Sequence, residues 1–163
     1  MDKKRSPAAL AAECGVLLAL AFALSYIERW IPAAPVPGLK LGLANIVTLI
    51  ALDRLGVLTS AGLVVARCAL TALLFGQLGS LGFALAGGLL ALAAMALLRR
   101  YPAFSVYGVS VGGAAAHNIG QTAAAAVVLG TPGVFGYLAY LLPLSIPMGL
   151  AVAWARQRVR RVA

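Results

Sequence analysis

Seven polar side chains occur within or at the edges of apolar segments, where they could bind a small solute. They are Glu28, Lys40, Asn45, Arg67, His117, Asn118 and Gln121. Charged groups and amides inside a membrane are costly, and they usually face a cavity or a partner. Arginine offers a planar fork of N–H donors and lysine a point charge, and both suit phosphate or carboxylate groups. We therefore expect an outward-facing pocket for a small anionic or hydrogen-bond-rich solute.

The spacing of these residues indicates how they could meet. His117 and Gln121, in the motif HNIGQ, are four residues apart and share one face of a helix, with Asn118 beside them. In the stretch PGLKLGLANI, Lys40 lies at the start of a predicted helix and Asn45 about one turn deeper. Each residue also has a structural alternative. A lysine can snorkel to lipid headgroups, amides can join neighbouring helices, and a lone histidine can belong to the core.

Glu28 and Arg67 differ in what they indicate about the solute. Glu28 could neutralise Lys40 or form an ion pair with a positively charged group of the solute. The sign of the charge on the solute therefore stays open. Arg67 lies near the middle of an apolar run, and a guanidinium has only donors and no acceptor of its own. Arg67 is therefore the hardest member of the set to explain by packing alone.

The composition predicts that lipid surrounds the elements that carry these residues. The chain has 163 residues, of which 63% are hydrophobic and 10% charged, and a domain of this size cannot hide so much apolar surface in a soluble core. Its net charge of +9 resides in short basic clusters between apolar runs, which favours orientation in a membrane over binding of nucleic acid. Cys14 and Cys68 lie in apolar stretches without a CxxC motif, so we expect no metal site and no cofactor.

The apolar runs predict an all-α integral membrane protein with a single transmembrane domain over residues 1–163. A span needs about 20 apolar residues, and continuous runs favour helices over a barrel. Pro/Gly-rich breaks separate six predicted transmembrane helices, and short basic tails at 1–8 and 156–163 flank them. The helices cover residues 9–30, 41–52, 57–75, 81–98, 106–129 and 134–155.

The distribution of basic residues predicts the orientation of these helices. With six spans, ten of the thirteen lysines and arginines fall on the side of the two termini. The far side receives only Arg29 and Lys40, while Arg67 lies within a span. Because short cytoplasmic segments are enriched in basic residues, both termini are predicted to be cytoplasmic.

Three stretches resemble a known family. The sequences PGLKLGLANIVTL, VVARCALTALLFG and HNIGQ look like those of the Gx transporter family, also labelled heptaprenyl diphosphate synthase component I. That family is similar to the substrate-binding S components of energy-coupling factor (ECF) transporters. The resemblance covers nearly the whole chain and implies an S-component-like bundle in the bacterial cell (inner) membrane. It also implies capture of a vitamin-like or precursor molecule.

The resemblance further implies protein partners. S components dock on a transmembrane coupling subunit that works with two ATPase subunits, and an alanine pair in their first helix contacts the coupling subunit. Ala19 and Ala23 match that pattern here. The chain carries no Walker motif, so any ATP hydrolysis is expected on partner subunits and the chain itself is not expected to be an enzyme.

Two other functions fit the same residues. An accessory membrane subunit of isoprenoid or quinone biosynthesis is suggested by the family label. However, Asp2 and Asp53 are the only aspartates, so the chain lacks the aspartate-rich motifs that hold magnesium in prenyl diphosphate synthases. A non-transport assembly subunit would use the polar side chains to join helices, and it would bind no small molecule.

Overall fold

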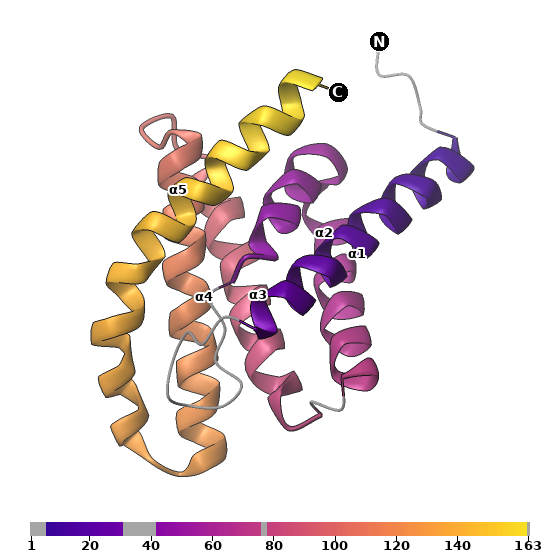
Figure 1. Cartoon of the computed structure of the whole chain (residues 1–163). Helices are drawn as coiled ribbons and strands as arrows, with labels where there is room; N and C mark the ends of the chain where they lie inside the picture. Colours follow the sequence, from indigo (N-terminus) through magenta and orange to yellow (C-terminus); the bar gives the residue numbers. More distant parts are fainter. Residues whose placement is uncertain (1–5, 31–41, 76–77, 163) are drawn as a thin grey trace.

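The computed structural model describes residues 6–30, 42–75 and 78–162, and all regular elements among these residues are helical (Figure 1). The predicted all-α class is therefore confirmed. Two short 3-10 helices, η1 and η2, cover Leu78–Ser80 and Pro132–Tyr137. The α-helices are α1 (Pro7–Arg29), α2 (Asn45–Leu74), α3 (Leu81–Leu98), α4 (Val106–Leu129) and α5 (Leu138–Val162).

Local sequence signals account for several helix ends. Ser6 caps α1 by accepting a hydrogen bond from the Ala9 N–H at 3.2 Å, and Pro7 follows at the first position of the helix. Ser105 caps α4 in the same way by accepting from the Gly108 N–H at 3.3 Å. Gly130 ends α4 in the left-handed conformation, with φ +61°. The breaks predicted on either side of α4 therefore coincide with its caps.

α2 folds back on itself at Gly56. This residue has φ +82° and ψ 177°, which are not helical and suit glycine. Val47 and Arg67 line the same cavity, although a straight helix would place them about 30 Å apart. The two halves of α2 therefore lie side by side, and they correspond to the predicted spans 41–52 and 57–75.

Four helical segments of the described chain are long and apolar enough to cross a membrane. They are Pro7–Arg29, Asn45–Leu74, Leu78–Leu98 and Pro132–Arg158. α4 is not among these four, and it carries a row of buried polar residues that includes Ser110, His117 and Thr122. The chain is therefore a multi-pass membrane protein by the length and composition of its helices. The count of six spans and the orientation of the termini stay predictions.

α4 occupies the middle of the bundle. It packs against α3 and α5, whereas the backbone of α1 comes close only to that of α2 among the described helices. One apolar cluster joins α2, α3, α4 and α5 through residues such as Leu52, Met95 and Val152, and another joins α1 to the first half of α2 through Leu17 and Ile50. The start of α1, the bend of α2 and the end of α5 lie at one end of the bundle (Figure 1). This arrangement surrounds the polar face of α4 with helices.

Candidate functional site

A small polar cavity lies between the ends of α1 and α2, the start of α3 and the middle of α4. Its volume is about 20 Å³, which is room for about one water molecule. Four of the seven predicted binding residues line it. The complete lining is Ser25, Glu28, Arg67, Cys68, Thr71, Ala84, His117 and Gln121.

Arg67 is the least compensated of these groups. The residue is 5% exposed, and its Nη2 lies 3.6 Å from Cys68 Sγ, a weak acceptor. Its Nε has no acceptor among the described residues. Because a buried donor without an acceptor is unfavourable, the Nε–H group needs an acceptor that the described chain does not provide.

Glu28 ties the end of α1 to the residues that lead into α2. The residue is 3% exposed, and its Oε1 accepts hydrogen bonds from the backbone N–H groups of Gly42 and Leu43, the latter at 3.1 Å. Gly42 has φ +84°, a conformation that glycine adopts readily. Glu28 therefore fixes the entry to α2, and it adds a carboxylate to the cavity that contains His117.

Asn45 lies beside this cavity with its amide unused. The residue is 2% exposed, and neither Oδ1 nor Nδ2 has a hydrogen-bond partner in the described part of the chain. A Cβ atom placed on Gly42 would lie 2.8 Å from Asn45 Nδ2 and 3.2 Å from His117 Cδ2. The side chains of Asn45 and His117 thus flank the same glycine, and Asn45 offers one donor and one acceptor group close to the histidine.

The HNIGQ motif divides between two environments. His117 and Gln121 line the cavity, as their shared face predicted. Asn118 instead points to α5, where its Nδ2 donates to the Leu141 carbonyl at 3.0 Å and to Ser145 Oγ at 2.9 Å. Gln121 Nε2 donates to Asn118 Oδ1 at 2.8 Å. Asn118 is therefore a helix-joining residue that holds Gln121 in place, and it does not line the cavity.

The sequence reasoning missed the glycines on α3 that make the site possible. A Cβ on Gly87 would lie 2.9 Å from the His117 carbonyl oxygen, and one on Gly88 would lie 3.1 Å from Arg67 Nη2. Two adjacent glycines inside an apolar helix are a recognisable signal of close packing, because glycine weakens a helix interior. The hydroxyl groups of Ser25 and Thr71 were also missed, and nothing in their spacing distinguishes them from other serines and threonines.

Three predicted residues stand apart from the cavity in other ways. Lys40 lies outside the described residues. Ala19 and Ala23, the predicted partner contacts, are both exposed on α1. They lie on the surface of the helix whose backbone comes close only to that of α2 among the described helices.

The fold and the site define a multi-pass helical membrane protein with a buried polar cavity. The family model of heptaprenyl diphosphate synthase component I matches residues 17–159. The chain belongs to this family, whose name describes one component of a multi-component enzyme. No curated protein and no solved structure matches the chain.

Proposed function

We propose that this chain is the solute-binding membrane subunit of an ECF-type importer. One observation carries the proposal: buried Arg67, with its Nε unpaired in the described chain, lines a cavity together with His117 and Gln121. A fixed guanidinium surrounded by hydrogen-bonding groups is suited to a carboxylate or phosphate. The solute is a small vitamin-like or precursor molecule that carries such a group.

Solute binding requires the cavity to expand. Pockets for small molecules occupy about 300–1,000 Å³, whereas this cavity measures about 20 Å³. α1 is the helix whose displacement disturbs the least backbone packing, because its backbone comes close only to that of α2 among the described helices. The present arrangement is therefore interpreted as a closed form of the site.

The proposed transport function also specifies the protein partners and the membrane topology. ATP hydrolysis takes place on two ATPase subunits, and a membrane coupling subunit docks on the exposed small residues Ala19 and Ala23 of α1. Six membrane-crossing segments follow if each half of α2 counts as one. Both termini are cytoplasmic in this proposal, in the membrane of a bacterial cell.

The direct test is native mass spectrometry of the full-length protein in detergent after exposure to a metabolite extract. Wild type is compared with Arg67→Gln and with the matched control Arg100→Gln, which removes an exposed arginine without a described side-chain contact. We expect a small molecule bound to wild type and to the control, and about tenfold weaker retention by Arg67→Gln. Equal retention by Arg67→Gln, with unchanged thermal stability, contradicts the site. An empty wild type contradicts the function.

The family description favours a second candidate, an accessory membrane subunit of isoprenoid or quinone biosynthesis. In that role the catalytic magnesium site would lie on another component, because Asp2 and Asp53 are this chain's only aspartates. Asp53 is moreover paired with Arg156. Prenyl-chain synthesis that depends on this chain, without any effect of Arg67→Gln, would favour this candidate over transport.

A further inference from the structure

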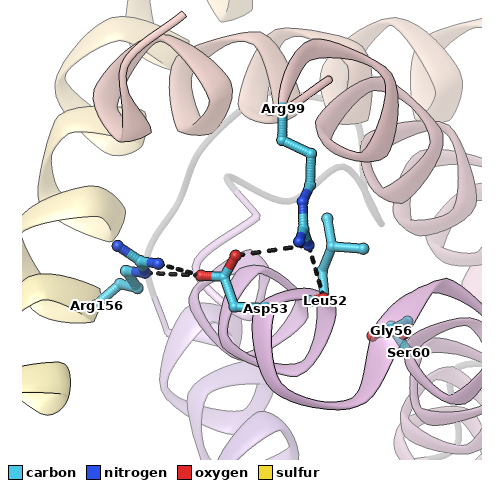
Figure 2. Close-up of polar contacts among 6 residues, drawn as sticks. All are labelled: Leu52, Asp53, Gly56, Ser60, Arg99 and Arg156. Atoms are coloured by element: carbon cyan, nitrogen blue, oxygen red, sulfur yellow. Dashed lines mark hydrogen bonds and ion pairs between the residues drawn. The ribbon is translucent and has the colours of Figure 1, made fainter. Parts of the chain in front are cut away.

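A second polar cluster lies at the opposite end of the bundle from the cavity of Arg67. Asp53 stands at its centre, between Arg156 of α5 and Arg99 at the end of α3 (Figure 2). Arg156 Nε lies 2.8 Å from Asp53 Oδ2, and Arg99 Nη1 lies 3.6 Å from Asp53 Oδ1. Arg99 Nη1 also donates to the Leu52 carbonyl at 2.7 Å. Two guanidinium groups against one carboxylate leave one positive charge uncompensated.

The two arginines retain donors that no group in the described part of the chain uses. Asp53 and Leu52 engage Nη1 of Arg99, and Asp53 engages Nε and Nη2 of Arg156. The described structure gives no acceptor to Nε and Nη2 of Arg99 or to Nη1 of Arg156. Asp53 thus orients both guanidinium groups and leaves part of each available to an external anion.

An apolar cavity opens beside these donors. Its volume is about 170 Å³, considerably more than that of the cavity at Arg67. Asp53, Arg99 and Arg156 form its polar part. Leu49, Phe104, Val106 and Val109 form the apolar part. A ligand that fits this site has an anionic head and an apolar body.

Aromatic side chains place this cavity at the depth of lipid headgroups. Tyr101, Phe104 and Trp154 are 55%, 46% and 56% exposed and belong to the same end of the bundle as the arginines. Tyrosine and tryptophan collect where a membrane meets water. Arg158 lies over the Trp154 ring, with Cζ 5.1 Å from the ring centroid. The amphiphile that is most abundant at this depth is the membrane lipid itself.

We propose that the Asp53–Arg99–Arg156 cluster and its cavity form a specific site for the phosphate headgroup of an anionic phospholipid. The free N–H groups of the two arginines bind the phosphate, and the apolar wall receives the start of an acyl chain. Arg54, the neighbouring cation, is engaged by Glu13 at 2.6 Å and is not part of the site. The inference does not depend on the proposed transport function, because it concerns other residues at the other end of the bundle.

Native mass spectrometry of the full-length protein tests the site by titration with phosphatidylglycerol and with phosphatidylcholine of identical acyl chains. We expect wild type to retain phosphatidylglycerol about tenfold better, because only this lipid carries a net negative charge. Arg99→Gln and Arg156→Gln should each reduce that retention about tenfold, whereas Arg100→Gln, next in sequence to Arg99, should leave it unchanged.

Each alternative outcome overturns the proposal in its own way. If wild type retains the two lipids equally, a site specific for an anionic headgroup is excluded, and this result does not depend on any variant. An equal loss with Arg100→Gln shows that the whole basic end attracts lipid without a specific site. Competition by inorganic phosphate or glycerol phosphate at similar concentrations identifies a site for a soluble anion, and thermal unfolding curves separate loss of binding from loss of fold.

Discussion

Asp53 and Arg156 are 103 positions apart in the chain, yet two nitrogens of the arginine contact one oxygen of the carboxylate, Nε at 2.8 Å (Figure 2). The contact joins the bend of α2 to the last turns of α5. The same carboxylate faces Arg99 through its other oxygen. One acidic side chain, three residues before the turn at Gly56, therefore links three helices.

This relationship predicts a measurable coupling between Asp53 and Arg156. Their side chains are 26% and 12% exposed, so the pair is less screened than a surface ion pair. A double-mutant cycle with Asp53→Asn and Arg156→Gln, followed by unfolding in detergent, should give a coupling free energy of about 1 kcal/mol. The pair Glu13–Arg54, whose arginine is 46% exposed, should give about half that value or less. Equal values for both pairs would contradict the structural role of Asp53.

The bend of α2 predicts opposite effects for two glycines of the same helix. A Cβ atom would meet nothing within 4 Å at either Gly56 or Gly62, so crowding does not distinguish them. Gly56 has φ +82°, where a side chain is strained, whereas Gly62 is in ordinary helical conformation. Gly56→Ala should lower the free energy of unfolding by about 1–2 kcal/mol. Gly62→Ala should be neutral or slightly stabilising. Thermal melting of the two variants checks this order, and an equal melting temperature would show that the bend is not fixed by Gly56.

The elements were largely predictable because their signals are local. Apolar runs and Pro/Gly breaks marked the helices, and the break between the predicted spans 41–52 and 57–75 contains the bend of α2 at Gly56. The shared face of His117 and Gln121 also followed from helical periodicity. These features depend on residues that are near in sequence, and a single chain contains that information.

The partners of each polar group were not predictable in the same way. Periodicity places Asn118 beside His117 but does not say that α5 covers it, and the contact with Ser145 appears only once the helices pack. The sequence likewise offers no reason to join Asp53 to Arg156. The adjacent glycines Gly87 and Gly88 can be recognised in the sequence as a site of close packing. Their role depends on which residues of α2 and α4 lie against them, and the sequence does not give that information.

The close approach of α4 to α3 at Gly87 predicts that a larger residue is not tolerated at this position. At Gly87 a methyl group would lie 2.9 Å from the backbone oxygen of His117, and backbone cannot yield as a side chain can. Gly87→Ala should therefore destabilise the protein by about 1–3 kcal/mol. Gly82→Ala, on the same helix with nothing within 4 Å, is the matched control and should not. Unfolding of both variants is the measurement, and tolerance of alanine at Gly87 would mean that α3 and α4 do not approach so closely.

The two buried asparagines allow stability and binding to be separated. Asn118 donates to the Leu141 carbonyl and Ser145 Oγ across a helix interface, so Asn118→Ala should cost about 1 kcal/mol of stability. Asn45 forms no hydrogen bond through its amide in the described chain. Asn45→Ala removes an unsatisfied buried group and should leave stability nearly unchanged.

Ligand retention should show the reverse order. If the amide of Asn45 contacts the solute, Asn45→Ala should weaken retention about tenfold in native mass spectrometry, because the lost contact is made only when the site is occupied. Asn118→Ala should affect retention less, since it acts on the solute only through Gln121. If Asn45→Ala instead lowers the melting temperature and retains the solute as well as wild type does, its amide is structural and the binding site does not extend to the start of α2.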